Sequence, residues 1–280
     1  MSLCRPSGHG CATEPTKGGY GTMKKLIIAS VLLLPAWQTA SAQDNRDYRV
    51  RLGLGAKLVP EYVGADKVEV APLFDIDIAR GDNQFRFEAP DDKFGIGVID
   101  SGGFSFGAAA NIQSSRKDSD VGAAVGKVKT TFELGAFAQY EANDSWRVRV
   151  DALQGVNGHK GLVGSIGADK IWRDGDKYVF SVGPRLMFSD AKNQRAYFGV
   201  TPAVALATGL PTYRPSSGIH AVAIASGLST QFNDRFGMFG FARYERLVGD
   251  AAKSPIVRAY GSRNQYSVGA GLNYTFRIKR

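Results

Sequence analysis

Strict two-residue alternation of apolar and polar side chains dominates the chain after Arg46. Successive side chains of a β-strand point to opposite faces, so this period predicts strands with one apolar and one polar face. No stretch carries the 3.6-residue apolar period of an extended helix. We expect twelve strands, at 48–59, 68–79, 83–89, 94–99, 104–113, 130–141, 145–154, 161–173, 177–189, 218–232, 235–248 and 264–276. More than half of the residues from Gln43 onward then lie in strands, which is reasonable only for a closed barrel.

Short and long connections alternate along these strands. Short turns include Arg80-Gly81-Asp82 and Asp174-Gly175-Asp176, whereas long polar stretches cover 114–129, 190–217 and 249–263. Outer-membrane barrels show this pattern, with short turns in the periplasm and long loops outside. The run 198–206 also alternates, but a thirteenth strand would spoil the even count, so we place it in the long loop. The expected fold class is all-β: a closed antiparallel transmembrane β-barrel of about twelve strands.

The length of the strands favours a membrane barrel over a soluble one. About 9–11 tilted residues cross a bilayer, and most of the runs reach that length. Aromatic residues such as Trp146, Trp172 and Tyr178 stand near strand ends, as in interfacial girdles. Alternation alone does not separate the two classes, so a secreted soluble sandwich or lipocalin-like barrel remains the alternative.

The residues before Gln43 predict export. Lys24 and Lys25 precede a short apolar run, and Ala40-Ser41-Ala42 closes it, which is the pattern of a secretory signal peptide. We therefore expect an upstream extension at 1–22, a signal peptide at 23–42 and a barrel at 43–280. Both cysteines, Cys4 and Cys11, precede the barrel, which excludes disulfides, thiolate metal sites and cysteine nucleophiles from it. Its net charge is +6, a weak indication of anionic partners.

Charged side chains share the polar faces of several strands and form a candidate charge network in the barrel lumen. In a wet pore such charges set ion preference, whereas in a filled lumen they must pair. The near balance of signs favours pairing and a small conductance. The candidate members are Arg49, Arg51, Asp75, Asp77, Glu133, Arg147, Arg149, Asp151 and Arg185, with Lys57, Glu69 and Asp169 as further possible partners.

The sequence offers little for catalysis or cofactors. Only His159 and His220 follow Gln43, and no nucleophile elbow surrounds Ser216 and Ser217 near His220. No carboxylate cluster accompanies the histidines, so we expect no metal site, and no cofactor or nucleic-acid module is indicated. Four loop cations are candidates for contact with lipopolysaccharide phosphates: Arg116, Lys117, Lys127 and Lys129. The simpler interpretation is that these side chains are charges exposed to solvent in a loop.

Several short motifs in order resemble the MltA-interacting protein (MipA/OmpV) family of outer-membrane proteins. They include Glu133-Leu134-Gly135 with Gly158-His159-Lys160-Gly161, and a series in the C-terminal half. The residues of that series are Gly183, Pro184, Arg185, Tyr197, Phe198, Gly199, Gly209, Leu210, Pro211, Ser254, Pro255, Gly261, Ser262 and Arg263. The resemblance implies an outer-membrane barrel with no assigned catalytic residues. It also implies that one member joins a lytic transglycosylase to a murein synthase, while others are linked to adhesion.

The last expected strand carries Tyr274 and Phe276 on its apolar face. This aromatic ending resembles the insertion signal that the barrel-assembly machinery of outer membranes reads, although the chain continues through 277–280. The leading function is a non-enzymatic binding or scaffolding role for murein-remodelling enzymes, in contact with outer-membrane lipid and lipopolysaccharide. The alternatives are a narrow channel for small solutes and a surface adhesin acting through 114–129, 190–217 and 249–263.

Overall fold

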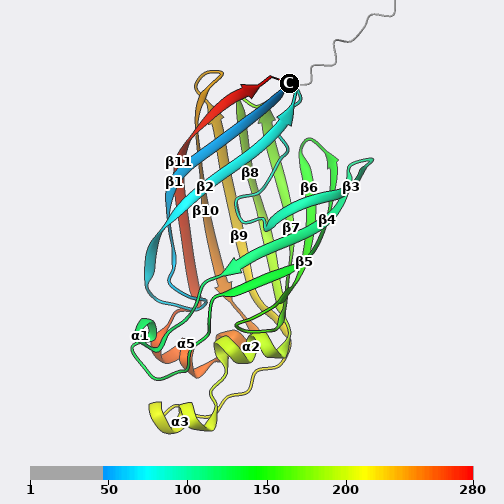
Figure 1. Ribbon diagram of the computed structural model, residues 1–280. Helices are drawn as coiled ribbons and strands as arrows, with labels where there is room; N and C mark the ends of the chain where they lie inside the picture. The colour runs from blue at the N-terminus through cyan, green and yellow to red at the C-terminus, as the bar shows by residue number, and fades with distance from the viewer. Residues whose placement is uncertain (1–46, 280) are drawn as a thin grey trace, which may run out of the picture. The chain divides into compact units, whose positions relative to one another are not determined.

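The computed structural model describes residues 47–279. The upstream extension, the signal peptide and the first residues of the expected barrel domain lie outside that range. Within it, eleven antiparallel strands form one strongly curled sheet (Figure 1). The strands are β1 (Tyr48–Pro60), β2 (Val68–Arg80), β3 (Phe94–Ser101), β4 (Phe104–Gln113), β5 (Thr131–Asn143), β6 (Trp146–Gly155), β7 (Leu162–Asp174), β8 (Tyr178–Ser189), β9 (Gly218–Gln231), β10 (Phe236–Leu247) and β11 (Asn264–Ile278).

Eleven of the twelve expected strands are confirmed to within a few residues, and one expectation is wrong. Residues 83–89 make no strand but pass through the space that the sheet encloses. The sheet order runs from β2 through β1, β11 and β10 down to β3, so β1 pairs with β11. Among the described residues, β2 and β3 are the two ends of the sheet and are not hydrogen-bonded to each other. The eleven-stranded sheet of the described residues is therefore not closed, and the closed twelve-stranded barrel expected from the sequence is not confirmed. We call these two edges the seam.

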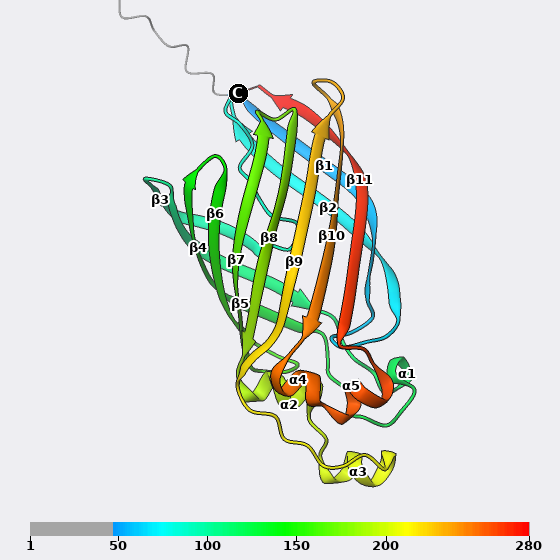
Figure 2. The ribbon, with the colours of Figure 1, turned by 180° about the vertical axis from the view of Figure 1, so that it is seen from behind.

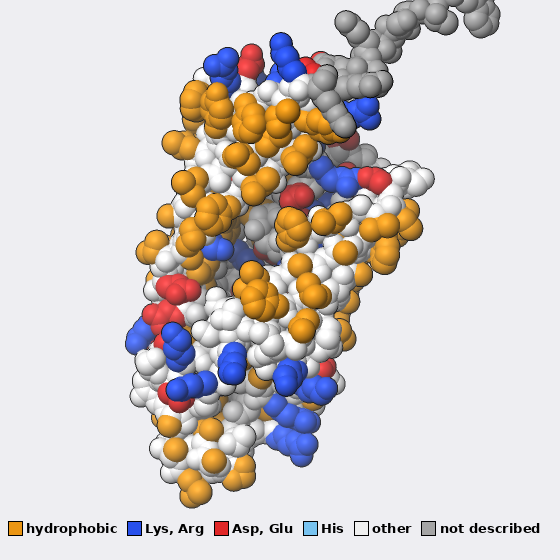
Figure 3. Space-filling view, viewed as in Figure 1, with side chains coloured by type: hydrophobic (Ala, Val, Ile, Leu, Met, Phe, Trp, Pro, Cys, Tyr) orange, Lys and Arg blue, Asp and Glu red, His pale blue; other side chains and the backbone are white. Residues whose placement is uncertain are grey.

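The two faces of the sheet have the polarity of a membrane barrel, with apolar side chains on the outer face and polar side chains on the inner face. Side chains such as Leu54, Phe74 and Ile96 project outward and are exposed, whereas Arg147, Asp169 and Asn273 point inward and are buried. Figure 3 shows hydrophobic side chains spread over the outer surface of the strands. A soluble barrel has the opposite distribution, so the outer face is built to contact lipid.

The connections at the two ends differ in length, as expected. Short turns link strands at the end where β1 begins and β11 ends, and long connections gather at the other end (Figure 2). The connection from β2 to β3 is the exception among the described residues: it starts at the short-turn end, so Arg80-Gly81-Asp82 is not the short strand-to-strand turn that was expected. The long connections of the described chain contain five short helices, which the alternating pattern did not predict. They are α1 (Asp118–Val121), α2 (Ala191–Phe198), α3 (Pro202–Thr208), α4 (Gly249–Lys253) and α5 (Pro255–Tyr260). Within residues 47–279, no helix combines the length and the apolar character that crossing a membrane would require.

These helices follow local capping signals. Thr201 accepts a hydrogen bond from the Val204 amide at the start of α3, Pro202 occupies the first turn, and Gly209 ends the helix in the left-handed region with φ of 72°. Asp190 caps α2 in the same way. The run 198–206 therefore lies in the long loop, as expected, but as the end of α2, an isolated bridge from Val200 to Tyr213, and most of α3. Tyr197 and Phe198 of α2 pack with Leu247 and Val257 in an apolar cluster that holds the loops together.

Candidate functional site

Three arginines on the inner face of β6 and β8 form the centre of the lumen. Arg147 and Arg185 both donate to Asp169 of β7 at 2.7 Å, one to each carboxylate oxygen. Arg149 donates to Asp151, two residues further along β6, at 2.9 Å. Period-two geometry places these side chains on one face, and the β6–β7 register sets Arg147 directly opposite Asp169. The structure therefore brings these members of the candidate network together as ion pairs.

A stretch between β2 and β3 completes this network from within. We call residues 81–93 the inner segment. Its Asp91 accepts from Arg185 at 3.0 Å, and its Asp92 accepts from Arg147 at 3.0 Å. The same Asp91 lies 3.7 Å from Arg243 of β10. The inner segment thus supplies carboxylates that the wall lacks, because Arg147 and Arg185 share a single wall acid.

The phenylalanines of the inner segment lie against guanidinium groups of the wall. Arg49 and Arg51 lie over the Phe85 ring at 4.8 and 4.7 Å, and Arg147 lies over Phe87 at 4.7 Å. A desolvated guanidinium on an aromatic face gains about 2 kcal/mol. Phe85 and Phe87 are both buried. These contacts explain how an alternating apolar segment can lie inside a charged lumen.

Near the turn end, two further arginines of the network have carboxylate partners. Arg49 donates to Asp176 at 2.7 Å, and Asp176 also accepts from the Phe85 amide. Arg51 lies 3.2 Å from Asp75 and 3.0 Å from Asp77 on the neighbouring β2. A hydrogen bond to Asp176 therefore holds the first part of the inner segment, and the ion pairs of Asp91 and Asp92 hold its other end.

Glu133 does not join the arginines. Its carboxylate contacts His159 Nε2 at 2.8 Å and accepts from Asn111 at 2.7 Å. The Gly161 amide donates to His159 Nδ1 at 3.0 Å, so Nε2 carries the proton that bonds to Glu133. The two sequence motifs that contain Glu133 and His159 thus meet in space at the loop end of the lumen. Their contact fastens the 156–161 loop to β5.

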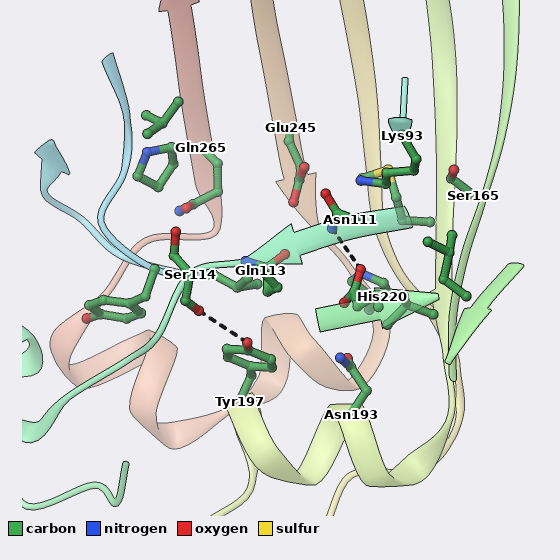
Figure 4. Close-up of a pocket in the computed structure, with 18 of the residues that line it drawn as sticks. Lys93, Asn111, Gln113, Ser114, Ser165, Asn193, Tyr197, His220, Glu245 and Gln265 are labelled. Atoms are coloured by element: carbon green, nitrogen blue, oxygen red, sulfur yellow. Dashed lines mark hydrogen bonds between the residues drawn. The ribbon is translucent and has the colours of Figure 1, made fainter. Parts of the chain in front are cut away.

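A cavity of about 280 Å³ is lined by Glu133 and by residues of the strands and of α2 (Figure 4). Amide and hydroxyl side chains project into it from several strands and from α2, alongside Tyr197 and His220. Burial raises the pKa of Tyr197 to about 12, and the nearby Glu133 carboxylate adds to that effect. Tyr197 therefore stays a neutral hydrogen-bonding phenol. The polar lining includes Lys93, Asn111, Gln113, Ser114, Glu133, Ser165, Asn193, Arg243, Glu245, Gln265 and Ser267. These groups are suited to hydrogen-bonding a small polar molecule.

A second cavity, of about 390 Å³, opens at the seam. Its walls include Phe74 and Asp77 of β2, Phe94 of β3, and Phe87 and Glu88 of the inner segment. Outward-facing Phe74 and inward-facing Asp77 line the same space, so the cavity extends from the outer surface into the lumen. Figure 3 shows the corresponding hollow, with charged side chains at its mouth.

The serine and histidine residues that were considered for catalysis have other hydrogen-bonding partners in the structure. Ser216 donates to Asp250, while His220 Nδ1 lies 3.1 Å from the Ser189 hydroxyl. Hydrogen bonds from Ser216 hold the pKa of Asp250 below its ordinary value. Among residues 47–279 no group of three or more histidine, cysteine or acidic side chains is placed to hold a metal ion. Arg116, expected at the surface, is instead buried and donates to the backbone carbonyls of Ala196, Tyr197 and Gly126.

A family model described as MltA-interacting protein MipA matches residues 52–276. The chain belongs to the MipA family. No curated protein matches the chain. Solved structures similar to it include a KdgM porin at 9% identity, covering 82% of this chain and 98% of that one, with a TM-score of 0.36. The translocator domain of autotransporter NalP from Neisseria meningitidis matches at 16% identity, 84% and 90% coverage, and a TM-score of 0.36.

Most of the MipA-type motif residues in this chain shape the loop end. The Ser254 hydroxyl donates to the Phe198 carbonyl at 2.8 Å, Pro255 begins α5, and the Ser262 amide donates to the Gly64 carbonyl at 3.0 Å. Gly199 and Gly209 end α2 and α3. Leu210 packs against the cluster around Val200, and Pro211 is exposed in the same loop. The backbone carbonyl of Arg263 accepts from the Leu247 amide. Gly261 lies against the Gly64 carbonyl, leaving no space for a side chain.

The remaining motif residues lie in the wall. Gly183 of β8 is so close to the Ala168 carbonyl that a Cβ would lie 1.7 Å from it, and outward-facing Pro184 interrupts the β7–β8 ladder. Arg185 is the lumen arginine described above. Tyr274 and Phe276 stack at 6.3 Å on the outer face of β11, where Tyr274 also contacts Phe236.

Asp91, Asp92, Asp176 and Arg243 are the network members that the sequence did not reveal. Asp91 and Asp92 follow Pro90 between the expected strands 83–89 and 94–99, where acidic residues are ordinary. The alternation along β10 places Arg243 on the inward face, and that position was the signal that could have identified it as a network member.

Proposed function

We propose that this chain is a non-enzymatic outer-membrane barrel that acts by binding, as a scaffold for murein-remodelling enzymes. The observation that carries the proposal is the occupied lumen. The inner segment lies across it, and the wall arginines pair with acids of both the wall and that segment. A barrel filled by its own ion-paired chain in this arrangement is suited to present surfaces rather than to pass solutes.

Family membership supports the choice of partner. The family description names an interaction with MltA, and the resemblance implies a lytic transglycosylase and a murein synthase as partners. In this proposal residues 23–42 direct export, the Tyr274–Phe276 strand end is read by the barrel-assembly machinery, and the outer face contacts lipid and lipopolysaccharide. The short-turn end faces the periplasm, where murein lies, so it is the end that meets the enzymes.

A pull-down from solubilised envelopes tests the scaffold. The folded barrel is immobilised in detergent beside an unrelated barrel, and retained proteins are identified by mass spectrometry. We expect selective retention of a lytic transglycosylase or a murein synthase. Charge reversal at the turn end, Asp144→Lys with Asp234→Lys, should reduce that retention, because both side chains are exposed there. The matched control, Lys253→Glu in the loop end, should leave it unchanged. Retention of neither enzyme above the unrelated barrel contradicts the proposal.

A further inference from the structure

The directions of the strands leave room for one more strand in the seam. Ten antiparallel pairings separate β2 from β3 around the sheet, so these two strands run in the same direction. A direct pairing of β2 with β3 would be parallel. One strand running the other way fits antiparallel to both. The inner segment runs that way, because it joins the end of β2 to the start of β3.

The sequence of the inner segment matches that vacancy on the β2 side. A two-residue turn at Gly81-Asp82 would set Arg80 opposite Asn83. The Asn83 amide already donates to the Arg80 carbonyl at 3.2 Å, and Gly81 has a φ of 58°. Continuing this register sets Ile78 opposite Phe85, Ile76 opposite Phe87 and Phe74 opposite Ala89. All three β2 side chains face lipid, so Phe85 and Phe87 would face lipid as well.

The register expected against β3 predicts the same orientation of the two phenylalanines. A four-residue connection at 90–93 would set Ala89 opposite Phe94, Phe87 opposite Ile96 and Phe85 opposite Val98. These β3 side chains are also exposed on the outer face. A one-residue slip on either side would turn the phenylalanines inward. Both registers therefore agree on which face of residues 83–89 meets lipid and which meets the lumen.

We propose that residues 83–89 exchange between the lumen and the seam, and that insertion into the seam opens a pore through the barrel. Unpaired strand edges are unfavourable in lipid, because no water satisfies their amide and carbonyl groups. Insertion would satisfy both edges and complete a twelve-stranded wall. The lumen position is stabilised instead by Asp91, Asp92 and the arginine–phenylalanine contacts. This inference does not rest on the scaffold function.

The open pore should prefer small anions. Insertion carries Asp91 and Asp92 toward the seam and away from β6 and β8. The wall then keeps Arg147, Arg149 and Arg185 against only Asp151 and Asp169. An excess of guanidinium groups along the wall of a pore favours anions.

Two cysteine pairs distinguish the two positions, since residues 43–280 contain no cysteine. Pro90→Cys with Gly227→Cys fixes the lumen position, because a Cβ at Gly227 would lie 2.6 Å from Pro90 Cγ. Ile76→Cys with Phe87→Cys reports the inserted position. Ile76 is 67% exposed on the outer face and Phe87 is 6% exposed inside, so they meet only after insertion. Ile76→Cys with Arg86→Cys is the matched control, since the two side chains share a face in neither position.

The full barrel is purified, oxidised and measured in planar bilayers with a potassium chloride gradient. We expect the Ile76–Phe87 pair to form a disulfide and to hold the barrel open, with a reversal potential of anionic sign. The Pro90–Gly227 disulfide should abolish conductance, and reduction should restore it. The proposal is overturned if the Ile76–Phe87 pair stays reduced while the Pro90–Gly227 pair oxidises, or if the latter disulfide leaves conductance unchanged. A cationic reversal potential overturns the anion preference.

Discussion

Asp169 accepts a hydrogen bond of 2.7 Å from Arg147, and neither side chain has more than 1% of its surface exposed. The same carboxylate also pairs with Arg185 through its other oxygen. One acid therefore joins β6, β7 and β8 in the lumen.

Replacing Asp169 by Asn should destabilise the barrel strongly. Removing one partner of a buried ion pair costs about 3–5 kcal/mol, and we expect about 3 kcal/mol because Asp91 and Asp92 still contact the two arginines. Urea unfolding in detergent micelles measures the change. Asp234→Asn, in an exposed turn, is the control. Equal midpoints for the two variants would contradict the assigned role of Asp169.

Phe87→Ala should loosen the inner segment. Deleting a buried phenylalanine ring costs about 3–5 kcal/mol, and the contact with Arg147 is lost with it. Trypsin should then cut more rapidly after Arg86 or Lys93 in the folded barrel. Leu206→Ala, in the exposed α3, should leave the cutting rate at these sites unchanged. Unaltered digestion of the Phe87 variant would show that the segment is held by its ion pairs alone.

Ser254→Ala tests the motif residues as loop fasteners. The Ser254 hydroxyl has no exposed surface and satisfies the Phe198 carbonyl, so its removal should cost about 1–3 kcal/mol. Hydrogen exchange of the α2 and α5 amides should accelerate. Ser217 is exposed in the same region, so Ser217→Ala should change these exchange rates little. If the α2 and α5 amides exchange at the same rate in both variants, the buried hydrogen bond does not fasten the loops.

The contact between Ser216 and Asp250 should weaken in acid. Its hydrogen bonds lower the pKa of Asp250 below the ordinary 3.8, so the folded state favours the carboxylate. That contribution is present above pH 3.8 and is lost as the pH falls through the lowered pKa. The difference in thermal midpoint between the unchanged protein and Ser216→Ala should therefore shrink below pH 3.8. A difference that stays constant into stronger acid would exclude this titration.

The sequence predicted the strands of the barrel wall better than the segment that lies inside the lumen. Period two locates β6 and β8 because each residue there meets either lipid or lumen, and it places Arg147, Arg149 and Arg185 inward for the same reason. The same period misplaced residues 83–89, since Phe85 and Phe87 can face guanidinium groups inside as well as lipid outside. Their position depends on Asp91 and Asp92 meeting residues far along the chain. Helices α1 to α5 escaped prediction because none exceeds eight residues, too few to show a 3.6-residue period.

The ladder between β1 and β11 places Tyr48 opposite Ile278. A short linker between these strand ends would therefore fuse them without disturbing the sheet. New ends could then be cut within 90–93, giving a circular permutant in which β3 to β11, β1 and β2 follow one another in the order of the sheet. In the natural connectivity, β1 emerges first from export and must wait for the last strand before it can pair on that side. The permutant would remove this wait, so assembly of its sheet could begin at one edge and proceed strand by strand to the other.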